Sequence, residues 1–268
     1  MAFGPSFRAS NGSRSRPVLL LLDIGNTHTH AAWVERGRIV HPADWPTAAW
    51  SQGKMLPLLN RQLRGRVPAA VALGSVVPAA AALAQRALLK AWGIKPFQLT
   101  HRTAQGIGID YPNPSSIGAD RLANAIGARA LHGAPVVVVG FGTAVAFDIV
   151  NRRGHYVGGI IAPGLAAMTS YLHEKTALLP RIKIREIEAV IGKSTEQAML
   201  IGAVHGYRGL IRELIQELKL ELKSPRLPVI ATGGYAELMA DRLPEITAVD
   251  QLLTLKGLRL AWELNQKS

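Results

Sequence analysis

Residues Val18 to His30 read V-L-L-L-L-D-I-G-N-T-H-T-H. Five consecutive large apolar residues are too few for a helix that must bury one stripe, but they suit a strand buried on both faces of a sheet. The run ends on Asp23-Ile24-Gly25-Asn26-Thr27, which brings together a carboxylate, a glycine, an amide and a hydroxyl. Glycine lets a backbone approach a phosphate, polar side chains add hydrogen bonds, and a carboxylate can hold hydrated Mg²⁺. The stretch fits either a phosphate-binding loop or a plain tight turn.

The same pattern returns later in the chain. Val136 to Ala144 reads V-V-V-V-G-F-G-T-A and aligns with Leu19 to Thr27: four aliphatic residues, a variable position, an apolar residue, a glycine and a hydrogen-bonding side chain. Two more strands are expected after the first strand of each half, so each half begins with a small antiparallel meander. The order of predicted strands and helices indicates a duplicated α/β protein with mixed sheets. Two glycine loops at strand ends would border a cleft that suits the phosphates of a nucleotide.

The composition is that of a globular protein. The chain has 268 residues, 48% of them hydrophobic, which is enough to bury a sizeable core. No apolar run approaches the roughly 20 residues needed to span a bilayer, so membrane insertion is not expected. Residues 1–16 mix arginines with Ser, Gly and Asn and lack the apolar segment of a signal peptide, which predicts a disordered tail. The absence of cysteine fits a reducing cytoplasm.

The chain is strongly basic, with 31 Lys+Arg against 18 Asp+Glu and a net charge of +13. Such a charge raises the question of nucleic-acid binding. The basic residues are spread along the chain, and only 6% of residues are aromatic, so no base-stacking platform is evident. A positive surface that attracts small anionic substrates explains the charge better. We therefore expect no nucleic-acid partner, and steep salt dependence of DNA binding would reverse that expectation.

A carboxylate and a guanidinium are predicted at the start of a helix. The stretch from Ile109 to Arg121 holds two prolines and a glycine, which keep it irregular until Asp120. Apolar residues at helical spacing follow, at Leu122, Ile126 and Ala130. Asp120 and Arg121 then lie in the first turn, at the positive end of the helix. Asp120 is either a simple helix cap or part of a site.

A long helix is predicted from Ser194 to Leu222. Small residues recur along one side of it, at Ala198, Gly202, Gly206 and Gly209. Each glycine inside a helix costs about 1 kcal/mol, so the stripe indicates close approach of another backbone. The partner could be another part of this chain or a second subunit.

Eight short motifs occur in order between about residues 18 and 265. They are D-I-G-N-T at 23–27, S-V-V-P at 75–78, Y-P-N-P at 111–114, G-A-D-R at 118–121, F-G-T-A at 141–144, G-G-I-I-A-P-G at 158–164, T-G-G at 232–234 and L-T-L-K-G-L at 253–258. Together they resemble the type III pantothenate kinases, of the acetate-and-sugar-kinase/actin-like superfamily. The resemblance implies two ribonuclease-H-like halves around an interdomain cleft, at residues 17–117 and 118–268.

The resemblance also implies an activity, a cytoplasmic homodimer and a set of site residues. The reaction is ATP-dependent phosphorylation of pantothenate to 4′-phosphopantothenate, the first step of coenzyme A synthesis. Asp120 would accept the proton, and Asp23 would hold Mg²⁺ indirectly. ATP would contact Asp23, Ile24, Gly25, Asn26, Thr27, His28, Thr29, His30 and Thr143. Pantothenate would contact Tyr111, Gly118, Ala119, Asp120 and Arg121, and also Thr195 of the other subunit.

The chemistry of these residues agrees with those roles. Phosphoryl transfer needs positioning and charge neutralisation, with a carboxylate to accept the hydroxyl proton. Arg121 can pair with the carboxylate of pantothenate in fork geometry. One position departs from the family, which usually has an aspartate before F-G-T-A that helps to hold K⁺ or NH₄⁺; here it is Gly140. Dependence on a monovalent cation is therefore not expected to follow the family. The alternative to a kinase is a non-catalytic relative that keeps the fold and binds a partner.

Overall fold

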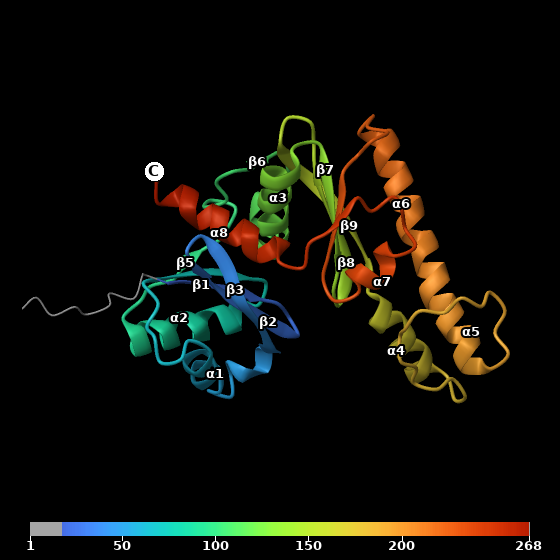
Figure 1. Ribbon diagram of the computed structural model, residues 1–268, viewed down its shortest axis with the longest axis horizontal. Helices are drawn as coiled ribbons and strands as arrows, with labels where there is room; N and C mark the ends of the chain where they lie inside the picture. Colours follow the sequence, from blue (N-terminus) through green and yellow to red (C-terminus); the bar gives the residue numbers. More distant parts are fainter. Residues whose placement is uncertain (1–17, 268) are drawn as a thin grey trace, which may run out of the picture.

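The computed structural model describes residues 18–267, and its strands form two mixed sheets (Figure 1). The first sheet contains β1 (Leu19–Ile24), β2 (His28–Glu35), β3 (Arg38–Pro46), β4 (Ala70–Ser75) and β5 (Phe97–Gln98). The second contains β6 (Gly108–Ile109), β7 (Val136–Phe141), β8 (Ala144–Val150), β9 (His155–Pro163), β10 (Val229–Thr232) and β11 (Ala248–Val249).

The two sheets share one core topology. Their strand orders are β3-β2-β1-β4-β5 and β11-β10-β7-β8-β9-β6. β1 pairs antiparallel with β2 and parallel with β4, and β7 pairs in the same way with β8 and β10. Each half therefore begins with an antiparallel meander and continues with a parallel strand. The predicted duplication is confirmed.

β1 is buried on both faces, as its unbroken apolar run predicts. Leu20, Leu22 and Ile24 belong to a core shared with two helices on one side, α1 (Met55–Gln62) and α2 (Pro78–Trp92). Leu19 and Leu21 belong to a separate core on the other side. The side chains alternate because successive residues of a strand point to opposite faces.

Two helices fill the space between the sheets, α3 (Ala119–His132) and α8 (Leu253–Asn265) (Figure 1). Leu122 of α3 and Leu258 of α8 pack with Leu21 on the first sheet. Ala125 of α3 packs with Val138 on the second. The sequence predicts a C-terminal helix over residues 258–264, and α8 starts earlier, at Leu253. The pair holds both sheets and sets the position of the first turn of α3.

Four helices cover the other face of the second sheet: α4 (Leu165–Lys175), α5 (Thr195–Ile201), α6 (Tyr207–Glu221) and α7 (Ala236–Ala240). α5 and α6 are one helix joined by a π-helical segment at Gly202–Gly206, close to the predicted range. The Ser194 hydroxyl caps it by accepting from the backbone N–H of Gln197 at 3.2 Å. Within residues 18–267, no heavy atom from elsewhere lies within 4 Å of a Cβ built at Gly202, Gly206 or Gly209. Among the described residues no other part of the chain packs on these three glycines, whereas Gly192 lies close to Ala198 of the same stripe.

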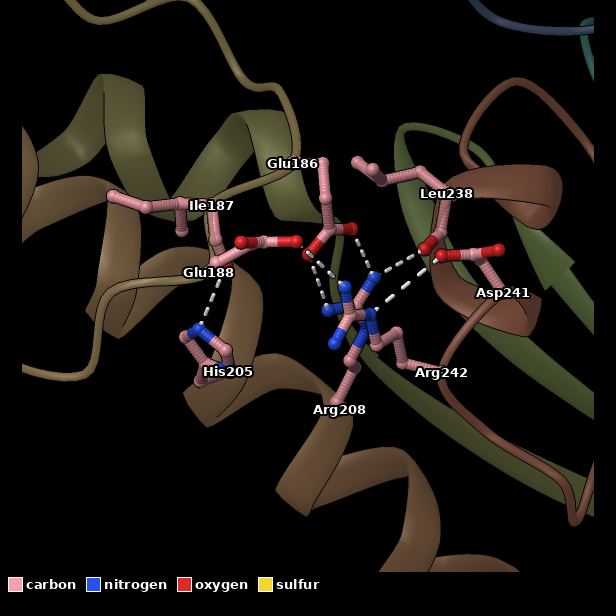
Figure 2. A network of polar contacts seen from close by, with 8 residues as sticks. All are labelled: Glu186, Ile187, Glu188, His205, Arg208, Leu238, Asp241 and Arg242. Atoms are coloured by element: carbon pink, nitrogen blue, oxygen red, sulfur yellow. Dashed lines mark hydrogen bonds and ion pairs between the residues drawn. The ribbon is translucent and has the colours of Figure 1, made fainter.

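A segment without helix or strand, residues 176–194, is tied to the start of α6 (Figure 2). Arg208 is buried and donates from both terminal nitrogens to the Glu186 carboxylate, at 3.0 and 2.5 Å. It also donates to the carbonyl oxygen of Leu238 at 2.6 Å. His205 lies 3.0 Å from the carbonyl oxygen of Ile187. These contacts fix the approach of the chain to α5.

The boundary between the halves at residues 117 and 118 stays a prediction. β6, which precedes it, pairs with β9 of the second sheet, and α8, which follows it, completes a core of the first. The predicted tail at residues 1–16 lies outside the described residues. None of the helices in residues 18–267 is long and apolar enough to cross a membrane.

Candidate active site

The two glycine loops face each other. The loop between β1 and β2 and the loop between β7 and β8 meet where the hydroxyl oxygens of Thr27 and Thr143 lie 3.2 Å apart. Both side chains are exposed. The backbone N–H of Gly25 closes the first turn by donating to the carbonyl of His28 at 2.9 Å. Two polar turns at strand ends therefore border one site, as the sequence predicts.

The first loop offers ligands mainly through residues 26–28, which are exposed. Ile24 is buried in the core. Thr29 is buried too, and its hydroxyl accepts from the indole N–H of Trp50 at 3.2 Å. His30 is exposed and lies 3.4 Å from the carboxylate of Asp44. Ile24 and Thr29 can thus meet a nucleotide only through their backbone.

Two carboxylates lie together below this loop. Asp23, at the end of β1, is only 8% exposed, and its pKa is raised to about 8 by burial and by the charge of Asp120. Burial also raises the pKa of Asp120, against the lowering effect of the Arg121 backbone N–H, which donates to it at 2.8 Å. Gly74 leaves room beside this pair, since a Cβ there would lie 3.9 Å from an Asp23 oxygen.

The pair of carboxylates fits a divalent cation. Charged carboxylates this close repel each other, and a cation between them and a phosphate chain removes the repulsion. Among residues 18–267, no group of three or more His, Cys, Asp or Glu side chains is placed to hold a metal by itself. Mg²⁺ needs no such group, because it is usually bound by one or two carboxylates, water and substrate phosphates. Asp23 and Asp120 match that arrangement.

Arg121 is held by the second sheet. Its Nε donates to Asp148 at 2.6 Å, and Nη2 donates to the carbonyl of Phe147 at 2.8 Å. Asp148 is fully buried in β8, and Asn124 donates to its other oxygen at 3.2 Å. The pKa of Asp148 is raised to about 6, because burial outweighs the stabilising charge of Arg121. The Cζ of Arg121 lies 5.8 Å from the centroid of the Tyr156 ring.

Tyr111 is linked to Arg121 through the ring of Tyr156, which both side chains contact. Its ring packs edge-on against Tyr156, with centroids 6.1 Å apart. A Cβ at Gly158, which has φ +131°, would lie 3.5 Å from the Tyr111 ring. At Gly118 a Cβ would lie 2.5 Å from the Asp120 carboxylate, so a side chain there would displace that carboxylate. The irregular stretch before α3 thus brings Tyr111 to the same side as Asp120.

The structure gathers most of the predicted site residues and leaves one apart. Asp23, Asp120 and Arg121 lie together, and Ala119 is buried beside them. Thr195 opens α5, which covers the face of the second sheet opposite α3 (Figure 1). A Cβ at Gly140 would make ordinary van der Waals contacts, 3.7 Å from the Ala146 carbonyl oxygen and 4.0 Å from Asn124 Nδ2.

Sequence reasoning missed Asp148 and Asn124. Asp148 interrupts an otherwise apolar strand, A-V-A-F-D-I-V. A carboxylate at such a position must be paired, because burying an unpaired charge is very costly. That signal points to Asp148, but it does not identify Arg121 as its partner.

Comparisons with known proteins show which family the sequence matches. Residues 19–217 match the family described as Type III pantothenate kinase. A type III pantothenate kinase of Methylacidiphilum infernorum is 42% identical over 253 residues, covering 92% of this chain and 88% of the relative.

Similar solved structures share the fold. One is a conserved protein assigned to the Baf family of transcriptional activators from Campylobacter jejuni, with a TM-score of 0.55, 18% identity and coverage of 93% of this chain and 100% of that one. Another is a protein assigned as a 2-dehydro-3-deoxygalactonokinase from Sinorhizobium meliloti, with a TM-score of 0.54, 10% identity and coverage of 92% and 96%. These likenesses show the fold, a mixed α/β fold with two sheets of similar topology. On the match of its sequence over most of its length, the chain belongs to the type III pantothenate kinase family.

Proposed function

We propose that the protein transfers the γ-phosphoryl group of ATP to pantothenate and forms 4′-phosphopantothenate. The observation that carries this proposal is the meeting of the two glycine loops at Thr27 and Thr143, together with the pair formed by Asp120 and Asp23, which lies in the strand that leads into the first loop. Phosphoryl transfer depends on positioning and on neutralising charge, and this arrangement supplies both. The absence of cysteine and the small-molecule chemistry fit a cytoplasmic enzyme.

The loops would hold the phosphates. Backbone N–H groups near Gly25 and Gly142 and the hydroxyls of Thr27 and Thr143 are suitable donors for phosphate oxygens. Asp23 would hold Mg²⁺, directly or through water, and the ion neutralises charge on the phosphates. The raised pKa of Asp23 supports this role, because it shows that the site disfavours an uncompensated carboxylate charge.

Asp120 would accept the proton of the pantothenate hydroxyl. A raised pKa makes a carboxylate a stronger base than an exposed one, provided that it is ionised when substrate binds. Bound Mg²⁺ favours the ionised form through its positive charge. The neighbouring Arg121 would pair with the carboxylate of pantothenate, at the end of the molecule away from the reacting hydroxyl.

The active form would be a homodimer in which Thr195 of one subunit reaches the pantothenate of the other. Two features of the outer face support this proposal. The glycines of the stripe leave open space on the helix. Large apolar side chains of α4 and of the segment that follows it are exposed, namely Met168, Tyr171, Leu172 and Leu178. Exposed apolar groups that gather on one side mark protein contacts.

The test is pantothenate-dependent ADP release by Asp120→Asn. We expect its kcat to fall by about 10²–10⁴-fold, the usual effect of losing a general base, with the fold intact. Asp110→Asn is the matched control. This carboxylate precedes the same helix, but it is exposed and paired with Arg153, at 2.7 Å. Turnover by a folded Asp120→Asn protein equal to that of Asp110→Asn would refute the role of Asp120, and a wild-type protein without pantothenate-dependent ADP release would refute the function.

A further inference from the structure

We infer that Asp148 is the positioning residue that aims Arg121 at the carboxylate of pantothenate. The inference rests on the proposed function and explains why the enzyme would prefer a substrate that carries a carboxylate. Asp148 is fully buried in β8 and accepts from Arg121 Nε at 2.6 Å. The adjacent carbonyl of Phe147 accepts from Nη2 of the same guanidinium at 2.8 Å. Two acceptors from one strand therefore hold one edge of a planar group.

Holding one edge leaves another for the substrate. A guanidinium has five N–H donors in a fixed fork, and Asp148 and Phe147 take the side that contains Nε. Within residues 18–267, Arg121 Nη1 donates to no protein acceptor. The Nη1–Nη2 edge can bind a planar carboxylate through two parallel hydrogen bonds. Its direction is fixed because the guanidinium cannot rotate without breaking both contacts to β8.

Asp148 is itself held in one orientation. Asn124 Nδ2 donates to its second oxygen at 3.2 Å, and the hydroxyl of Thr254 donates to Asn124 Oδ1 at 2.8 Å. The Thr254 contact therefore turns the Asn124 amide so that its nitrogen faces Asp148. An asparagine at 148 would place its own NH₂ group against that nitrogen or against Arg121. The site thus requires an acceptor on both oxygens, which a carboxylate provides and an amide does not.

A direct catalytic role for Asp148 does not fit its surroundings. Its side chain has no exposed surface, and both oxygens already accept hydrogen bonds. Asp23 ends the strand before the first glycine loop and interacts with Asp120, and these two carboxylates are the ones proposed to serve the cation and the proton. Asp148 acts through Arg121, so it should affect ground-state binding of the acid group more than the chemical step.

The test compares pantothenate with pantothenol, in which CH₂OH replaces the carboxylate. At saturating ATP, the KM of pantothenate and the inhibition constant of pantothenol against pantothenate are measured for wild type and Asp148→Asn. We expect the variant to raise the KM of pantothenate about tenfold, with kcat and the inhibition constant of pantothenol within about twofold of wild type, because only uniform binding of the acid is lost. Equal weakening of both ligands, or no change for either, would overturn the inference.

Two further variants separate positioning from stability. Asp148→Asn combined with Asn124→Asp exchanges the carboxylate and the amide, so that a donor again faces an acceptor. The double variant should bring the KM of pantothenate most of the way back to the wild-type value. Glu245→Gln is the control. This carboxylate is also largely buried, and it is paired with Arg212 at 3.2 Å. The change should leave the ratio of the pantothenate KM to the pantothenol inhibition constant as in wild type. A swapped variant no better than Asp148→Asn, or a shifted ratio in Glu245→Gln, would count against the inference.

Poor folding of Asp148→Asn would not leave the idea untested. Thr254→Val removes only the hydroxyl that orients Asn124, and it should shift the ratio in the same direction by about threefold. An unchanged ratio in that variant would overturn the positioning chain. These outcomes differ from failure of the proposed function, in which wild type itself would not phosphorylate pantothenate.

Discussion

At the scale of single residues, one group of the candidate site, the buried carboxylate of Asp23, lowers the stability of the fold when it is ionised. Asp23 is buried beside a second carboxylate, and its pKa of about 8 lies far above the ordinary 3.8. Between about pH 4 and pH 8 the folded protein therefore holds a proton on Asp23 that the unfolded chain has already released. The free energy of unfolding should fall as the pH rises through this range, and the loss is complete above about pH 8.

Asp23→Asn should remove this pH dependence. In magnesium-free buffer at pH 8.5 we expect the variant to be more stable than wild type, by on the order of 2–5 kcal/mol, and the two proteins to converge near pH 4. Denaturant unfolding across that pH range measures the effect. The kinase activity of Asp23→Asn, which we expect to be lost, is measured separately. Asp110→Asn, an exposed carboxylate, serves as the control. Parallel pH curves for Asp23→Asn and wild type would contradict the prediction.

Gly140 leads to a prediction about ions. Without a carboxylate at this position, we expect turnover to depend little on K⁺ or NH₄⁺, because a hard cation is held by oxygen ligands and their charge. Gly140→Asp should create or strengthen that dependence, and a Cβ at this position meets its neighbours only at ordinary van der Waals distances. Activity of both proteins in sodium and potassium buffers of equal ionic strength makes the comparison. Strong potassium activation of the unmodified protein would show that other oxygens complete a cation site.

Residue-level prediction succeeds where the signal is local. Asp23 and Thr143 stand directly after apolar runs, and a polar turn at a strand end is visible in the sequence. The Arg121–Asp148 pair is not visible, since it joins a helix to a strand 27 positions later. Thr29 shows the converse, because its place in a polar run does not reveal that it faces Trp50 and the core.

At the scale of elements, α3 and α8 are packed unusually close. A Cβ at Gly257 would overlap the carbonyl of Ala123, and one at Gly127 would lie 2.9 Å from the carbonyl of Leu253. The sequence indicates α8 only from Leu258, because a glycine lowers helix propensity and reads as a break. The structure continues the helix back to Leu253, since contact with α3 outweighs propensity. Packing between distant elements is what sequence patterns lack.

Gly257→Ala should therefore destabilise the protein, although alanine is the better helix former. We expect a loss of about 2–3 kcal/mol, because the helices must separate to admit the methyl group. Denaturant unfolding measures it. Gly234→Ala is the control, with no heavy atom within 4 Å of the added Cβ, and it should change stability by no more than about 0.5 kcal/mol. A Gly257→Ala protein as stable as this control would mean that α8 shifts without cost.

At the scale of the whole molecule, the outer face of the second sheet carries the proposed subunit contact. Gly206→Leu should separate the subunits and lower pantothenate-dependent activity at the same time. Within one chain the leucine has open space, so misfolding is not the expected cause. Size-exclusion chromatography at assay concentration, with activity measured across the peak, makes the test. Gly206→Ala, which stays small, should remain dimeric and active, and a fully active monomer of either variant would contradict the proposal.

The duplicated plan of the molecule is predictable from sequence because each half repeats a strand and a glycine loop. The closure of the halves is not, since it depends on α8 returning from the end of the chain to the first sheet. No local pattern near Leu253 says which sheet the helix will meet.

That return of α8 sets a timetable for synthesis. Leu19 and Leu21 leave the ribosome well before Leu255 and Leu258, which cover them. One apolar face of the first sheet therefore stays exposed to water, and able to bind other apolar surfaces, until α8 has been made. Contacts between such distant positions also slow folding and leave newly made chains open to aggregation. The first sheet therefore emerges before the helix that covers one of its faces, so nascent chains of this protein should need chaperone protection until α8 has been made.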